Sequence, residues 1–471
     1  MNRYHLPAML IGLGFLSVTA GSTAPTDRTP DPRLSGGATT VSETGIHAFS
    51  HPAANTSLLR RDSFFIGNAF FKQPWVSAPA STRARDGLGP LFNANSCQGC
   101  HVKDGKSDAL RAPGAGPHGL LVRLGLPART PAEREQASIR GSLPDPVYGD
   151  QFQPNGIPGV DGEGRVRLDF ENLPVRFSDG EVLTLRKPLL TLEALNYGPL
   201  APESLSSVRA TPVMIGLGLL AAIPEADILA LADPEDADKD GISGRPNRVW
   251  DLNRQQTVLG RFGWKANQPS IAQQTAAAFH GDLGISSDRF PEQPCTEAQD
   301  ACRRATQGGK PEISTEILEQ VVFYASMLAV PARRSVDDPV VLQGERLFRQ
   351  TGCAGCHRPA FQTGSLPGFP ELEQQSIQPF TDLLLHDMGP GLADGRPDFE
   401  ASGQEWRTAP LWGLGLVQTV NPEAGFLHDG RAASVMEAIL WHGGEAETAR
   451  QAVLALDKTD RNALVHFLES L

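Results

Sequence analysis

The sequence predicts a mainly α-helical fold with extensive loops and short strands, and three observations favour it. Gly and Pro are abundant, at 48 and 38 of 471 residues, whereas Tyr is scarce, at 4. This composition is typical of short helices joined by ordered loops. Two Cys-rich motifs of the same form, beginning at Cys97 and Cys353, each follow a segment with helical periodicity. The length indicates two or three domains rather than one.

The N-terminus has the pattern of a secretory signal over residues 1–20. Arg3 supplies a positive charge, an apolar stretch runs from Leu6 to Val18, and small residues then offer a cleavage site. The alternative is an uncleaved anchor, but the apolar run is shorter than the roughly 20 residues that span a bilayer. We therefore expect an exported, periplasmic protein with no stable membrane span after cleavage. A flexible segment is expected over residues 21–55.

The charge balance is acidic, with 42 basic and 54 acidic residues and a net charge of −12. The basic residues do not cluster, so nucleic acid is not an expected partner. An acidic surface either steers a basic redox partner or simply keeps the protein soluble, and the sequence leaves both readings open.

Four of the six cysteines lie in two motifs, Ser-Cys-Gln-Gly-Cys-His at 96–101 and Gly-Cys-Ala-Gly-Cys-His at 352–357. The pattern C-x-x-C-H is the attachment signature of c-type haem. Two thiols one turn apart can both add to the haem vinyl groups, and the adjacent His is held beneath the iron. Zinc or thioredoxin-like chemistry is the alternative, but neither requires a His at the same offset twice. The motifs predict two covalently bound haems, with attachment and iron-ligand residues Cys97, Cys100, His101, Cys353, Cys356 and His357.

The remaining cysteines, Cys295 and Cys302, lie in a Pro-containing loop. In an oxidising compartment they are expected to form a disulfide that closes a small loop. A pair of free thiols with redox chemistry is the alternative.

The elements expected along the chain surround the two motifs. Helical patterns are expected at 64–71, 316–328, 341–348 and 459–471, and strands at 120–124 and 182–186. The first and last helices of a cytochrome c fold cross, and the patterns at 341–348 and 459–471 are placed to do so. We therefore expect two cytochrome c-like haem domains, over 56–335 and 336–471. A large loop-rich insertion elaborates the first.

After about residue 60 the sequence resembles the di-haem oxidoreductase (peroxidase) family, also labelled thiol oxidoreductases. Its relatives are the bacterial di-haem cytochrome c peroxidases and the di-haem enzyme that matures methylamine dehydrogenase. The resemblance rests on seven segments: Asp86–Phe92, Pro144–Gln151, Asp236–Asn247, Gly260–Lys265, Thr381–Gly389, Glu405–Trp412 and Leu427–Arg431.

The resemblance implies a peroxidase-like oxidoreductase in which a six-coordinate haem passes electrons to a substrate-binding haem. The implied partners are a small redox protein or quinol-linked electron donor and a peroxide-like oxidant. A non-enzymatic electron-transfer cytochrome is the alternative, and oxidative modification of a protein partner is a third reading.

For the second haem, the position of the relatives' distal ligand falls on His442, where the relatives carry Met or Tyr. Ligation by His357 and His442 is therefore a hypothesis drawn from position. Met388 competes with it, and His442 could instead cap a helix end. His428 and Arg431 are expected to contact haem propionates or to fix their loop.

For the first haem, the relatives' distal pocket holds a Gln and a Glu, and the corresponding residues are Gln151 and Glu163. The carboxylate would act as acid–base catalyst for O–O cleavage. The alternative is two solvent-exposed loop residues. His118 lies where peroxidases place a His that blocks the iron, and an ordinary surface His is the other reading.

Two further features remain open. Trp264 is either an electron relay between the haems, as a Trp is in the relatives, or a buried core residue. Asp236, Asp238 and Asp240 resemble the start of a calcium loop. Because Asn247 occupies the place of the expected bidentate Glu, calcium is one reading and a solvated acidic loop is the other.

Overall fold

The computed structural model describes residue 1, residues 31–107 and residues 119–471. Contacts group Pro32–Leu471 into one compact unit. The expected signal segment, apart from Met1, and His118 lie outside the described residues. Within the segment expected to be flexible, Ala48 and Phe49 are fully buried. The domain division at residues 335 and 336 stays a prediction.

The expected mainly helical fold is wrong, because the chain is mixed α/β with 32% helix and 18% strand. Part of the helix lies in α5, a helix of 13 residues that was not expected from the sequence. The helices are α1 (Leu58–Lys72), α2 (Pro131–Arg140), α3 (Leu217–Ala222), α4 (Glu225–Leu229), α5 (Ile271–Leu283), α6 (Asp300–Arg303), α7 (Thr315–Met327), α8 (Pro339–Gln350), α9 (Gly389–Leu392), α10 (Val417–Val420), α11 (Val435–Leu440), α12 (Glu447–Ala455) and α13 (Lys458–Ser470).

The strands form several small antiparallel sheets rather than one large one. They are β1 (Leu91–Phe92), β2 (Leu120–Gly125), β3 (Gln151–Phe152), β4 (Asn155–Gly156), β5 (Arg165–Arg176), β6 (Val182–Glu193), β7 (Leu205–Ala210), β8 (Arg248–Asp251), β9 (Gln256–Leu259), β10 (Phe361–Gln362), β11 (Ser376–Ile377), β12 (Leu385–Asp387) and β13 (Glu405–Arg407). The largest sheet has the order β3-β2-β7, and the others are pairs.

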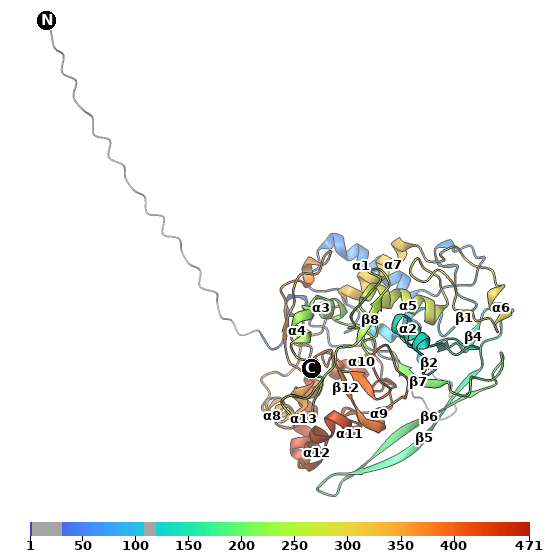
Figure 1. Ribbon diagram of the computed structural model, residues 1–471. Helices are drawn as coiled ribbons and strands as arrows, with labels where there is room; N and C mark the ends of the chain where they lie inside the picture. The colour runs from blue at the N-terminus through green and yellow to red at the C-terminus, as the bar shows by residue number, and fades with distance from the viewer. Residues whose placement is uncertain (2–30, 108–118) are drawn as a thin grey trace. The chain divides into compact units, whose positions relative to one another are not determined.

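The main reason for the correction is the hairpin of β5 and β6, in which twelve residues of each strand pair in register from Arg165 with Glu193 to Arg176 with Val182. From the sequence, only a short strand at 182–186 is expected. Figure 1 shows this hairpin as a long arm whose turn lies near α12. At the turn, the backbone N–H of Ser178 donates to the carbonyl of Leu454 (3.1 Å). The insertion therefore reaches the C-terminal helices.

Close helix crossings flank each motif. A Cβ on Gly67 of α1 would lie 2.1 Å from the carbonyl oxygen of Gln320 on α7, and one on Gly344 of α8 would lie 2.0 Å from that of Ala463 on α13. Only glycine permits backbones to approach this closely. The helices expected at 341–348 and 459–471 are thus present as α8 and α13, and they pack against each other at Gly344.

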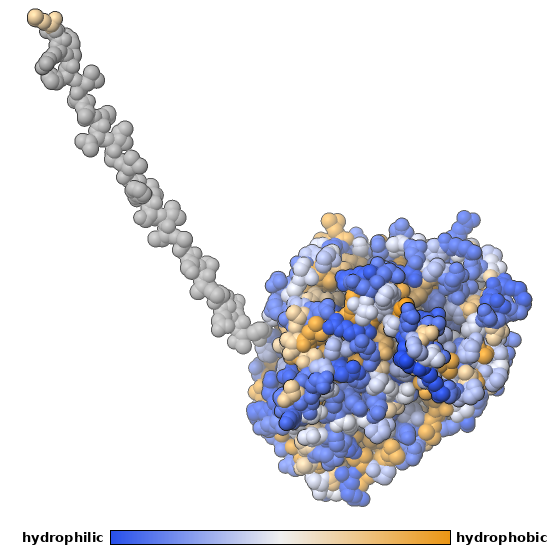
Figure 2. Space-filling view, viewed as in Figure 1, coloured by the Kyte–Doolittle hydropathy of each residue, from blue (hydrophilic) through white to orange (hydrophobic). Residues whose placement is uncertain are grey.

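The surface is mixed in polarity. Figure 2 shows hydrophilic and hydrophobic residues interspersed over the viewed face, with the hydrophilic ones predominating. Among the residues that the structure describes, no helix combines the length and the apolar character needed to cross a membrane.

Candidate functional site

Both Cys-rich motifs line one continuous cavity of about 710 Å³. Its walls include Cys97, Cys100 and His101 of the first motif and Cys353, Cys356 and His357 of the second. Much of the remaining wall is apolar, with residues such as Leu121, Phe279, Phe348, Leu392, Val417 and Ile439. The two sites are therefore neighbouring parts of one partly open cavity, although their motifs are far apart in the sequence.

Each motif folds as a tight 3₁₀ turn that brings its two thiols and its imidazole to the cavity. In the first motif, the backbone N–H groups of Cys100 and His101 both donate to the carbonyl of Cys97, at 3.1 and 2.9 Å. In the second, the N–H of His357 donates to the carbonyl of Cys353 (3.1 Å). None of the four thiols is in a disulfide.

The two motif imidazoles are oriented in the same way. Nδ1 of His101 lies 3.1 Å from the carbonyl oxygen of Pro212, and Nδ1 of His357 lies 2.9 Å from that of Phe380. A carbonyl only accepts, so Nδ1 carries the proton and Nε2 is the nitrogen left for a metal. Burial lowers the pKa of each imidazole to about 4, which keeps both neutral, as iron ligation requires.

Two cations without a closely paired carboxylate also line the cavity, the buried Lys106 and the half-buried Arg407. Arg407 donates to the carbonyls of Gly263 (3.0 Å) and Thr408 (2.9 Å), and Lys106 donates to the carbonyl of Leu427 (3.1 Å). Burial lowers the pKa of Arg407 to about 10 and that of Lys106 to about 8. Neither forms a close ion pair with a carboxylate among the described residues, and Asp429 and Asp382 act on Lys106 and Arg407, respectively, from a greater distance.

An isolated buried cation is costly, so these side chains fit a ligand that brings its own negative charge. Haem carries two propionates. Two haems fit this cavity. It offers four thiols, two available imidazole nitrogens, apolar walls and two cations without a closely paired carboxylate.

Gln151 and Glu163 are buried, at 3% and 1% exposure, so the reading as solvent-exposed loop residues is wrong. Neither lines the cavity. Gln151 donates from Nε2 to Oδ1 of Asp282 (2.8 Å), and it is Asp282 that faces the cavity beside Cys97. Burial raises the pKa of the Asp282 carboxyl. The structure therefore places the Asp282 carboxyl at the wall and Gln151 behind it, whereas Glu163 lies outside the wall with other partners.

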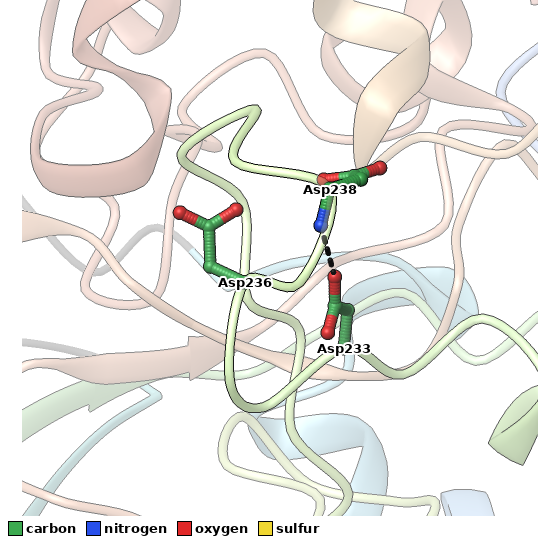
Figure 3. Close-up of side chains that lie close together, drawn as sticks. All are labelled: Asp233, Asp236 and Asp238. Carbon is green, nitrogen blue, oxygen red and sulfur yellow. Dashed lines mark hydrogen bonds between the residues drawn. The ribbon is translucent and has the colours of Figure 1, made fainter.

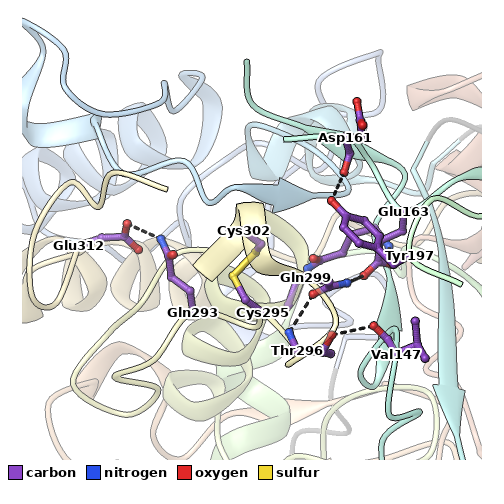
Figure 4. The surroundings of a disulfide bond; sticks show 12 residues. Val147, Asp161, Glu163, Tyr197, Gln293, Cys295, Thr296, Gln299, Cys302 and Glu312 are labelled. Carbon is purple, nitrogen blue, oxygen red and sulfur yellow. Dashed lines mark hydrogen bonds between the residues drawn. A yellow bond between two sulfur atoms is a disulfide. The ribbon is translucent and has the colours of Figure 1, made fainter. Parts of the chain in front are cut away.

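Glu163 lies against the loop closed by the disulfide between Cys295 and Cys302, which confirms that predicted pairing (Figure 4). Its Oε1 accepts from Nε2 of Gln299 (2.6 Å), and its Oε2 accepts from the backbone N–H of Gln153 (2.5 Å). Burial nevertheless raises the pKa of Glu163 to about 8. This carboxyl is thus able to hold a proton at neutral pH.

The comparison with family models decides the identity of the chain. The model described as "Di-haem oxidoreductase, putative peroxidase" matches residues 30–471. The chain belongs to the di-haem oxidoreductase family. Membership implies two haems, in agreement with the two motifs in the cavity. No curated protein and no solved structure matches the chain.

In this di-haem oxidoreductase, two candidate sixth ligands line the cavity near the second motif, His442 and Met388. Nδ1 of His442 lies 2.8 Å from the carbonyl oxygen of Ala438, which leaves Nε2 as the free nitrogen. His442 also contributes to the lowered pKa of His357, so the two imidazoles lie within electrostatic reach of each other. The geometry is compatible with ligation by both, and it leaves Met388 as an alternative.

His428 and Arg431 occupy different environments. His428 lines the cavity and its ring stacks on that of Trp406, with centroids 3.6 Å apart. Arg431 instead pairs with Asp429, through Nε at 2.8 Å, and donates to the carbonyl of Gly391 (2.7 Å). Arg431 therefore fixes its loop in the structure, whereas His428 is placed to contact a bound group.

Trp264 also lines the cavity that holds both motifs. Its Nε1 donates to the carbonyl of Ala210 (2.8 Å), and Nζ of Lys106 lies 4.7 Å from the ring centroid. The ring is partly buried and packs against the hydrophobic core. Its position fits both an electron relay and a core role, and both stay predictions.

The aspartates that cluster in the acidic loop are not the three that the sequence suggested. Ligand atoms of Asp233, Asp236 and Asp238 lie within 4.8 Å of one another (Figure 3). Asp240 is not part of this group, and its carboxylate accepts from the backbone N–H of Ile242 (2.8 Å). The calcium site stays a prediction.

Sequence reasoning missed Asp282 and the helix that carries it. Seven α5 residues line the cavity: Ile271, Gln274, Thr275, Ala278, Phe279, Asp282 and Leu283. Their spacing is that of one helix face, and this periodicity was the available signal. Nothing in the sequence alone related that face to Cys97. Arg407 and Lys106 were missed for the same reason, because their isolation from carboxylates exists only in the folded chain.

Proposed function

We propose that the protein is an exported, peroxidase-like c-type cytochrome with two covalently bound haems. It takes electrons from a small redox protein or a quinol-linked donor and delivers them to a peroxide-like oxidant. His357 and His442 would hold the haem that takes up electrons, and His101 would hold the haem that passes them to the oxidant. One observation carries the proposal: both motifs share a single cavity, but their surroundings are unequal.

The surroundings of the two motifs differ in the side chain that lies near each motif imidazole. The second motif has a second histidine in the cavity, the half-buried His442, whose Nε2 is free. The first has a carboxyl at the wall, Asp282, backed by Gln151. A site with two imidazoles suits electron storage, and a site with an acid–base group suits substrate chemistry.

The protein side chains have defined tasks in this proposal. The two cysteines of each motif hold a haem, His101 and His357 offer Nε2 to iron, and Arg407 and Lys106 neutralise propionates. A bound haem would supply the iron at which the peroxide is reduced.

Proton supply is assigned to Glu163 and Asp282. Glu163 is buried and Asp282 is half-buried, and desolvation raises the pKa of both, so both hold protons more readily than exposed carboxyls. When the O–O bond breaks, the leaving hydroxide requires a proton. Asp282 faces the cavity, and Glu163, outside the cavity wall, is the second carboxyl that holds a proton.

Export to the periplasm is part of the proposal. It is supported by the signal-like N-terminus and by a disulfide, which persists in oxidising compartments. A calcium ion at the acidic loop stays a further prediction.

The decisive experiment combines spectroscopy with turnover. We expect the oxidised holoprotein to show one high-spin and one low-spin ferric signal by electron paramagnetic resonance, and to consume hydrogen peroxide with a reduced small cytochrome. Two low-spin signals without peroxide turnover would instead identify an electron carrier.

Replacing His442 with Ala tests the ligand assignment. We expect the low-spin signal of the second haem to be lost and a second high-spin signal to appear, because His357 alone then remains. Met388→Ala is the matched control and should keep the low-spin signal. If the two variants behave in the opposite way, Met388 is the ligand.

A further inference from the structure

The loop closed by the disulfide carries the side chain that binds Glu163. Gln299 lies between Cys295 and Cys302 in sequence, immediately before α6, and it is fully buried. Its Nε2 donates to Oε1 of Glu163 at 2.6 Å. Figure 4 shows the amide pointing from the disulfide-closed loop toward the carboxyl. A residue distant in sequence from the strands of the first site is therefore a direct partner of Glu163.

The orientation of the Gln299 amide is fixed by its other partner. Oε1 of Gln299 accepts from the backbone N–H of Thr296 (2.8 Å), and Oγ1 of Thr296 donates to the carbonyl of Val147 (2.7 Å). With Oε1 engaged as an acceptor, Nε2 must face Glu163. The disulfide joins the two ends of this segment, and Cys302 is itself buried. Thr296, Gln299 and the disulfide thus form one small rigid unit.

The environment of Glu163 makes this donated hydrogen bond important. The charged groups that act on the carboxyl are two further carboxylates, Asp145 and Asp150. The phenols of Tyr148 and Tyr197 lie within electrostatic range of it. No cation is among the groups that shift its pKa most strongly. Two N–H donors, from Gln299 and from the backbone of Gln153, are the groups that oppose burial.

We propose that Gln299, held in place by the Cys295–Cys302 disulfide, is a positioning residue that fixes the Glu163 carboxyl and tunes its proton affinity. The hydrogen bond between Gln299 and Glu163 does not depend on what the protein catalyses. The effect of Gln299 on peroxide turnover rests on the function proposed above. The disulfide then has a role beyond general stability: it constrains the segment that presents the amide.

The test is a titration of Glu163 in the di-haem holoprotein by infrared difference spectroscopy. The carbonyl band of the protonated Glu163 carboxyl is assigned by its absence in Glu163→Gln. In Gln299→Met, which keeps the side-chain length but has no N–H donor, we expect the titration midpoint to rise by about one pH unit. The alkaline limb of the peroxide turnover profile should move with it.

Gln293→Met is the matched control. Gln293 lies on the other side of the disulfide and donates from Nε2 to Glu312 (2.8 Å), so its loss should leave the Glu163 midpoint unchanged. The double variant Cys295→Ser/Cys302→Ser should raise the midpoint as Gln299→Met does, and should speed hydrogen exchange over residues 295–303.

An unchanged midpoint in Gln299→Met overturns the inference. An unchanged midpoint in the cysteine variant, with a raised one in Gln299→Met, removes the disulfide from it and so overturns that part. If the midpoint rises in Gln299→Met but Glu163→Gln turns over peroxide at the wild-type rate, the positioning role stands and the proposed function of Glu163 fails.

Discussion

Replacing Cys97 and Cys100 together with Ser is expected to leave one haem on each polypeptide and to abolish peroxide turnover. The thiols of the first motif lie one turn apart on the wall of the shared cavity, where both can bond to one haem. Without them, His101 offers only a single coordinate bond. Cys353→Ser/Cys356→Ser should likewise leave one haem, at the first motif.

The measurement is the number of haems per polypeptide after extraction with acidified acetone, which removes haem that is not covalently bound. The wild type should retain two, and each double variant one. Cys295→Ser/Cys302→Ser is the matched control, because it also removes two cysteines but should retain both haems. Two haems surviving extraction in the Cys97→Ser/Cys100→Ser variant would show that attachment does not depend on this motif.

Features encoded within a few residues were predictable from the sequence. The two motifs, the Cys295–Cys302 disulfide and the helices α8 and α13 all depend on short-range patterns. The pairing of α8 with α13 also followed, because it needed only an amphipathic pattern before and after one motif.

Features that depend on long-range pairing were not predictable in this way. The strands β5 and β6 lie in a segment rich in Gly and Pro, and their length became apparent only from their mutual register. A single amphipathic strand is a weak signal, since its partner supplies much of its stability. The mixed α/β character was therefore underestimated.

The residues of the candidate site also fall into a group encoded by short-range patterns and a group that depends on long-range contacts. Iron ligands and attachment cysteines could be assigned from the motifs, whereas the wall of the cavity could not. Asp282 and Gln151 come from different elements, α5 and β3, and meet only in the folded chain. The resemblance to the relatives pointed to Glu163, but only the structure places it outside the cavity wall and beside Gln299.

Replacing Glu163 with Gln is expected to lower the rate of peroxide turnover by about 10²–10⁴-fold, the range typical of a lost acid–base group. The amide keeps the shape of the side chain but cannot give up a proton. In the wild type, the rate should fall as the pH rises through about 8, because the raised pKa means that the carboxyl is protonated below that pH and ionised above it. The variant should lack this alkaline limb.

Glu312→Gln is the matched control for this variant. The Glu312 carboxyl is also buried enough for its pKa to be raised, and it also accepts from a glutamine amide near the disulfide. It is not, however, bonded to Glu163 or to Gln299, so turnover and its pH profile should stay at the wild-type values. A wild-type rate in Glu163→Gln would remove Glu163 from the proton supply. Asp282→Asn would then show whether the carboxyl at the cavity wall performs that task alone. Burial raises the pKa of Asp282, so this carboxyl can donate a proton without Glu163.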